Sequence, residues 1–208
     1  YLINLLMKKI IFLYISIISF KDKLLKIIFF EIWYSIINIG KGKSFKEPDI
    51  HPTPYYFSYK IAQFINKMKI ASVAELGCGF GRITNFLGKK TTAKIFGYEI
   101  DEEAFVIANK YKHSNTIIKK QDITKLNFDD LDVDCFIMAD PFYQLTNVNV
   151  DHQQNMIKKI ENSKDSKGKK YYIITVNINE SRNYMFNNKK LIKVISAGPK
   201  RKVKIYSN

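Results

Sequence analysis

The chain of 208 residues has few of the side chains that build disulfides or metal centres. It holds two cysteines, Cys78 and Cys135, and three histidines, His51, His113 and His152. The cysteines fit no metal-ligand spacing and the histidines are scattered along the sequence, so we expect no metal site. Two isolated cysteines favour free thiols in a reducing compartment, and a cytoplasmic protein is therefore expected.

Arginine is scarce as well, although the chain is strongly basic. The formal net charge is +15, but only Arg82, Arg182 and Arg201 of the 34 basic residues are arginines. Nucleic-acid interfaces favour arginine because its guanidinium makes two parallel hydrogen bonds. Nucleic acid is therefore an open but less favoured partner, and a lysine-rich solvated surface with no specific partner stays an alternative.

The apolar run near the N-terminus is too short to cross a membrane. Residues 10–20 are uncharged over 11 positions, whereas a spanning helix needs about 20. We expect residues 1–45 to form a helical extension that packs on the rest of the chain. The alternative is peripheral contact of residues 1–40 with the inner membrane face. Residues 46–208 are expected to form one domain, and its oligomeric state stays open.

A glycine-rich stretch, VAELGCGFGR at residues 73–82, is the most informative feature of the sequence. An apolar run reaches Glu75, and Gly77, Gly79 and Gly81 follow at alternate positions. This order predicts a strand, a tight turn and a helix start, as in α/β proteins that hold a nucleotide-like ligand. A dinucleotide-binding loop reads G-x-G-x-x-G, but here the third glycine comes one residue early.

The next three predicted strands lead into acids. Glu99 stands 24 positions after Glu75, which is near the spacing of a β-α-β unit whose carboxylate accepts from both ribose hydroxyls. A third predicted strand ends at Asp122, and a buried apolar run ends at Asp140. The alternatives are a solvated acid at a strand end for Glu99 and a plain loop aspartate for Asp122. For Asp140 the alternative is a strand-to-loop turn with a packed aromatic pair. Farther on, residues 191–195 and 203–206 alternate around a Gly-Pro turn, which predicts a hairpin.

The spacing E-x-G-x-G-x-G resembles motif I of the class I S-adenosylmethionine-dependent methyltransferases, and the order of elements over residues 71–178 agrees with that family. The resemblance implies an α/β fold: a Rossmann-like, mostly parallel sheet with a C-terminal antiparallel hairpin, flanked by helices. It implies S-adenosyl-L-methionine as cofactor. The cofactor-binding positions that it implies are Tyr55, Glu75, Gly77, Cys78, Gly79, Gly81, Arg82, Glu99, Ile100, Asp122, Ile123, Asp140 and Pro141.

In this family the glycine loop and the first acid hold the methionine end of the cofactor. By resemblance, Glu99 would hold the ribose, and Asp122 would meet the adenine amine with Ile123 against the ring. The tetrad at residues 140–143 corresponds to motif IV and resembles the D-P-P-Y motif of amino-group methyltransferases. Phe142 replaces the second proline, which weakens the transfer of a base-methylating role.

A proline-rich segment before motif I, with His51 and Tyr55 in it, resembles part of a bacterial methyltransferase group that is linked to glycans and small molecules. The catalytic candidates are Asp140, Tyr143 and His51, with Asp140 and His51 able to take a proton from an oxygen acceptor. We therefore expect a methyltransferase whose acceptor is a small molecule or glycan, methylated at oxygen. The alternatives are N-methylation of RNA or DNA bases and a non-catalytic cofactor-binding protein.

Overall fold

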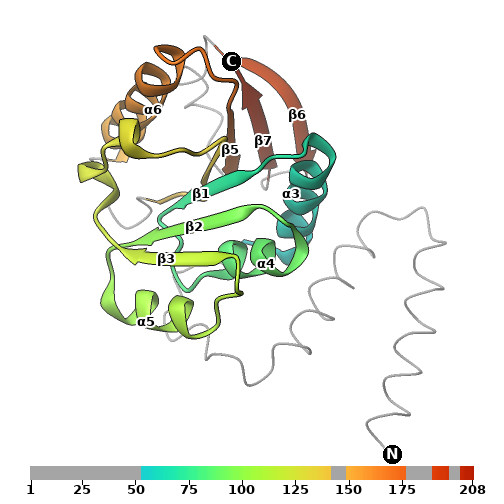
Figure 1. Ribbon diagram of the computed structural model, residues 1–208, viewed down its shortest axis with the longest axis vertical. Coiled ribbons are helices and arrows are strands. Elements are labelled where there is room, and N and C mark those ends of the chain that lie inside the picture. The colour runs from blue at the N-terminus through green and yellow to red at the C-terminus, as the bar shows by residue number, and fades with distance from the viewer. Residues whose placement is uncertain (1–52, 142–148, 177–188, 197–201) are drawn as a thin grey trace, which may run out of the picture.

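The computed structural model describes residues 53–141, 149–176, 189–196 and 202–208, and Figure 1 shows their arrangement. The predicted extension over residues 1–45, together with His51, Phe142 and Tyr143, lies outside these residues. The division of the chain at residue 45 therefore stays a prediction. No helix within the described ranges is both long and apolar enough to span a membrane.

A central sheet organises this part of the chain, in the order β3-β2-β1-β4-β5-β7-β6. Strands β1 to β5 are parallel to one another. β7 lies between β5 and β6 and is antiparallel to both. The predicted mostly parallel sheet with a terminal hairpin is thus confirmed. The strands are β1 (Ser72–Leu76), β2 (Lys94–Glu99), β3 (Thr116–Lys120), β4 (Cys135–Met138), β5 (Tyr172–Val176), β6 (Lys190–Ser196) and β7 (Lys202–Ser207).

Helices cover both faces of the sheet (Figure 1). On one face of the sheet, Val73, Ile95 and Ile137 pack in a hydrophobic core with α3 and α4. On the other face, Phe136 packs in a second core with the buried side of α6. Alternate residues of each strand thus face different cores, as the pleat requires. The helices are α3 (Tyr55–Met68), α4 (Arg82–Lys90), α5 (Glu102–Lys110) and α6 (Asn149–Asp165), with short 3-10 turns η1 (Ile123–Lys125) and η2 (Phe128–Asp130).

The strand order reverses between β1 and β4. From β1 the chain proceeds outward to β2 and β3, and then returns to place β4 on the other side of β1. Ligands of open α/β sheets bind at the carboxyl ends of the strands where this reversal occurs. The glycine loop follows β1 directly, and Asp140 follows β4, so both stand at this point.

Candidate active site

The glycine loop has the backbone shape that its composition predicts. Gly77, Gly79 and Gly81 have φ values of 76°, 51° and 78°, a left-handed region that is costly for other residues. Gly77 is also restricted by space, because a Cβ there would lie 2.8 Å from the Cβ of Pro141. The segment after β4 therefore packs directly against the start of the loop.

Glu99 ties this loop to the end of β2. Its Oε2 accepts from the backbone N of Gly79 at 2.6 Å. Its Oε1 accepts from the backbone N atoms of Ile100 and Asp101 at 2.8 and 2.9 Å. The two carboxylate oxygens have further lone pairs, so the side chain can also accept from ribose hydroxyls. Ile100 is 62% exposed beside it.

Glu75 lies in a different environment, although it is in β1, the neighbouring strand. Its side chain is buried, and its Oε2 accepts from the hydroxyl of Thr84 in α4. Burial raises the pKa of the Glu75 carboxyl to about 8, and the charge of Glu99 adds to this, against the opposing hydrogen bonds from Thr84. The Cys78 thiol is buried nearby. Its pKa is raised well above the usual value, mainly by burial and to a lesser extent by the charges of both glutamates.

Arg82 and Tyr55 meet at the starts of α4 and α3. The guanidinium Cζ of Arg82 lies 3.9 Å from the ring centroid of Tyr55, within cation–π range. The Tyr55 ring in turn lies 6.0 Å from that of Phe86. The structure thus brings these two predicted cofactor residues together, immediately after the glycine loop.

Asp122 and Ile123 follow β3, which ends at Lys120 and is two residues shorter than predicted. The shortening has a local cause: the Asp122 side chain caps η1 by accepting from the N and Oγ1 of Thr124 at 2.9 and 2.7 Å. These bonds hold the pKa of Asp122 below its usual value. Ile123 is buried in the core beside α6, and its contact with adenine stays a prediction.

Asp140 stands after β4, with a left-handed φ of 49°. The side-chain amide of Gln153, a fully buried residue of α6, donates to its Oδ1 at 3.4 Å. Pro141 follows and packs on Gly77. The loop after β1 and the acid after β4 are therefore neighbours, as the resemblance implies for motifs I and IV.

Comparison with known proteins agrees with this geometry. Residues 73–168 match the family model of a methyltransferase domain. Residues 73–168 thus form a methyltransferase domain, and its fold is the one that class I methyltransferases share. Its family uses S-adenosylmethionine as cofactor, and the tight glycine loop with the two strand-end acids fits that group. None of the curated proteins matches the chain.

Several solved methyltransferases share the fold at low sequence identity. A protein from Pyrococcus horikoshii, named as a candidate RNA methyltransferase, is 19% identical with a TM-score of 0.60, covering 82% of this chain and 92% of its own. An RNA methyltransferase from Salinibacter ruber, in complex with S-adenosylhomocysteine, is 13% identical with a TM-score of 0.55, covering 76% and 93%. A TehB-like enzyme from Corynebacterium glutamicum is 15% identical with a TM-score of 0.53, covering 70% and 85%.

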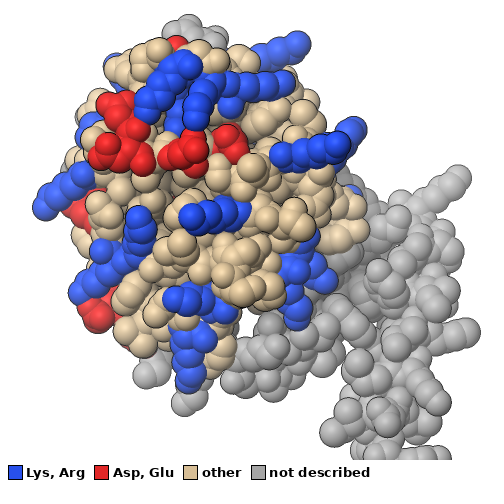
Figure 2. Space-filling view, viewed as in Figure 1, with Lys and Arg blue, Asp and Glu red and all other residues tan. Residues whose placement is uncertain are grey.

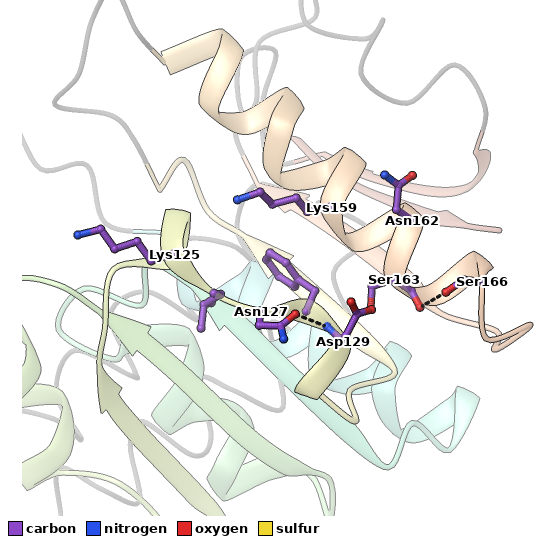
Figure 3. A pocket seen from close by; sticks show the side chains of 9 residues that line it. Lys125, Asn127, Asp129, Lys159, Asn162, Ser163 and Ser166 are labelled. Atoms are coloured by element: carbon purple, nitrogen blue, oxygen red, sulfur yellow. Dashed lines mark hydrogen bonds between the residues drawn. The ribbon is translucent and has the colours of Figure 1, made fainter.

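Two hollows in the described part of the chain are lined by no residue of the glycine loop. One, of about 500 Å³, runs between α6 and the η1–η2 connection (Figure 3). A second, of about 400 Å³, shares Lys159 and Asn162 with it and reaches Ile123. Mostly exposed polar side chains such as Lys125 and Asn155 line them.

Two residues of the site were not predicted from the sequence, Thr84 and Gln153. Thr84 is the third residue of α4, a position whose N–H lacks a partner inside the helix, and an acid before a glycine turn is a natural acceptor for it. That local signal points to Thr84. No comparable signal exists for Gln153, because its contact with Asp140 depends on how α6 packs. Within the described residues, no cluster of potential metal ligands occurs.

Proposed function

We propose that this methyltransferase transfers the methyl group of S-adenosylmethionine to an oxygen atom of a small-molecule or glycan acceptor. One observation carries the proposal: Pro141 packs on Gly77 and thereby holds Asp140 beside the cofactor loop. A carboxylate at this position can accept the proton that a hydroxyl acceptor must lose.

Different residues would bind different parts of the cofactor and the acceptor. The cofactor supplies an activated methyl group, and the protein contributes orientation and a shielded pocket. Glu75 and the loop over residues 77–81 would hold the methionine end, and Glu99 the ribose. Asp140, oriented by the Gln153 amide, would hold the acceptor hydroxyl and take its proton. Tyr143 and His51 stay candidates for the acceptor side.

The first experiment identifies the acceptor class. The full chain is incubated with methyl-labelled S-adenosylmethionine and a lysate that is then separated into glycan, small-molecule, lipid, nucleic-acid and protein fractions. Label in the glycan or small-molecule fraction supports the proposal. Label in no fraction, from a protein that binds the cofactor, supports the non-catalytic alternative.

The second experiment tests the role of Asp140. Asp140→Asn keeps the shape of the side chain but removes its basicity, so methyl transfer should fall about 10²- to 10⁴-fold, far more than cofactor affinity falls. Asp129→Asn is the matched control, since Asp129 is exposed and lines the hollow beside α6. Equal transfer by both variants would rule out Asp140 as the base.

N-methylation of RNA bases is the second candidate. The tetrad at residues 140–143, the net charge of +15 and the two RNA methyltransferase structures support it. Against it, lysines and arginines are spread over the displayed face of the domain and form no single patch (Figure 2). This candidate predicts label in the nucleic-acid fraction and RNA affinity that falls steeply as salt rises.

A further inference from the structure

The buried acid at the end of β1 has no cationic partner among the residues that the structure describes. Glu75 is 2% exposed. The donors that reach it are the hydroxyl and the backbone N–H of Thr84, and no ion pair found in these ranges includes it. A buried carboxylate without a paired cation is costly, and such a group commonly takes up a proton.

The groups that face Glu75 favour the same outcome. Glu99 approaches from β2, and the Cys78 thiol is buried in the loop. The charge of Glu99 disfavours a second negative charge nearby, whereas Thr84 at the start of α4 favours one. Burial outweighs the hydrogen bonds, so the pKa of Glu75 is raised to about 8 and most of the carboxyl is protonated at neutral pH.

We propose that Glu75 is a neutral carboxylic acid in the ligand-free protein and releases its proton when the ammonium group of the cofactor binds beside it. The proposal rests on the proposed function, in which the methionine end lies at Glu75. The O–H bond of the acid breaks, its electron pair stays on the carboxylate, and the proton passes to the buffer. The resulting carboxylate pairs with the ammonium group, which supplies the missing cation.

Thr84 is the positioning residue of this exchange. Its hydroxyl donates to Glu75 Oε2 and favours the ionised form, because a donated hydrogen bond stabilises a carboxylate. Packing fixes the position of Thr84: a Cβ on Gly97 would lie 3.2 Å from its Cγ2. Thr84 therefore sets how readily Glu75 loses its proton without itself touching the cofactor.

Calorimetry with S-adenosylhomocysteine tests the proton release. Binding to the full chain is measured at pH 6.5 in two buffers of different ionisation enthalpy, which gives the number of protons released. We expect about one proton for the wild type and about none for Glu75→Gln, which has no proton to lose. 5′-Methylthioadenosine lacks the amino-acid end of the cofactor, so its binding to the wild type should release about none.

Affinity over a pH series tests Thr84. The association constant of the wild type should fall about tenfold per pH unit on the acid side of pH 8. Thr84→Val removes the hydroxyl at nearly constant volume, so this decline should begin at a higher pH. Thr84→Ser keeps the hydroxyl and should restore the wild-type profile.

The outcomes separate this proposal from the proposed function. Equal proton release by S-adenosylhomocysteine and 5′-methylthioadenosine, or by the wild type and Glu75→Gln, overturns the proton exchange and leaves the methyltransferase assignment intact. If the Gln variant fails to fold, the ligand pair and the Thr84 pair decide alone. A folded wild type that binds neither ligand at any pH overturns the proposed function itself.

Discussion

Glu75 and Glu99 show how neighbouring strands can give the same residue two environments. β1 and β2 pair in parallel, with Leu76 opposite Tyr98. Glu75 and Glu99 therefore both lie near the carboxyl ends of their strands. Glu99 accepts from three backbone N–H groups of the loop and the following turn. Glu75 points into the fold and accepts only from Thr84 among the described donors. Both side chains are buried, so the number and kind of hydrogen-bond donors, rather than residue type or exposure, distinguish their environments.

The pH dependence of stability should report the environment of Glu75 most strongly. The pKa of Glu75 is raised from 4.5 to about 8 in the folded protein. The folded state therefore binds more protons than the unfolded state between these values. The contribution of this group to stability should be complete below about pH 4.5 and decline up to pH 8, by at most about 1.4 kcal/mol per pH unit.

Denaturant titrations of the wild type and Glu75→Gln across this pH range measure the effect. The free energy of unfolding of the wild type should fall relative to that of the variant as pH rises. Parallel curves would mean that the pKa of Glu75 is the same in the folded and unfolded states.

Removal of Glu99 should have the next largest effect. Glu99→Ala removes the proposed ribose contact and the bond to Gly79 N. Because hydrogen bonds to charged groups contribute about 1.5–3 kcal/mol each, cofactor affinity should fall by about 10²-fold. Glu102→Ala is the matched control, since Glu102 is exposed in the first turn of α5. Undiminished binding of S-adenosylhomocysteine by Glu99→Ala in calorimetry would contradict the assignment.

Alanine substitutions at Gly77 and Gly79 compare the part of the loop that packs on Pro141 with the part that donates to Glu99. Their effects on stability should be smaller than the effects above. A Cβ at Gly77 meets Pro141 at 2.8 Å, whereas a Cβ at Gly79 meets nothing within 4 Å. Both residues have positive φ, so each substitution carries backbone strain. Gly77→Ala should lower stability by about 1–3 kcal/mol more than Gly79→Ala, because only the former adds a steric overlap. Thermal unfolding of both variants measures this difference, and equal losses would argue against the Gly77–Pro141 contact.

Loss of a helix cap on the Glu99 side should have the smallest effect. The Asp101 side chain accepts from Ala104 N at 2.8 Å at the start of α5. Asp101→Ala should cost about 1 kcal/mol, and Asp101→Asn should keep most of the cap. The backbone N–H that Asp101 donates to Glu99 remains in both variants, so cofactor affinity should hardly change. A large loss of affinity with either would show that the α5 cap also orders the glycine loop.

Much of the fold was predictable because its signals are local. The buried run before Asp140 predicted β4, and the alternation around residues 197–200 predicted the β6–β7 pair. The third strand was predicted two residues too long, because the sequence pattern did not reveal that Asp122 caps η1. A side-chain cap is a local hydrogen bond that competes with strand pairing. The pattern of apolar residues does not reveal such a cap.

In the candidate site, too, some features were predictable from the sequence and others were not. Sequence alone determined the glycine loop and the acids at strand ends, because positive φ demands glycine and a β-α-β unit sets the spacing. The resemblance of this motif to the class I methyltransferases implied the cofactor. The tertiary structure alone decided that Pro141 closes on Gly77, that Gln153 reaches Asp140 and that Thr84 meets Glu75. It also decided that Glu99 accepts from three backbone N–H groups, whereas Glu75 accepts from Thr84. These features depend on packing between distant segments, and burial and pairing across such contacts set the protonation state of an acid.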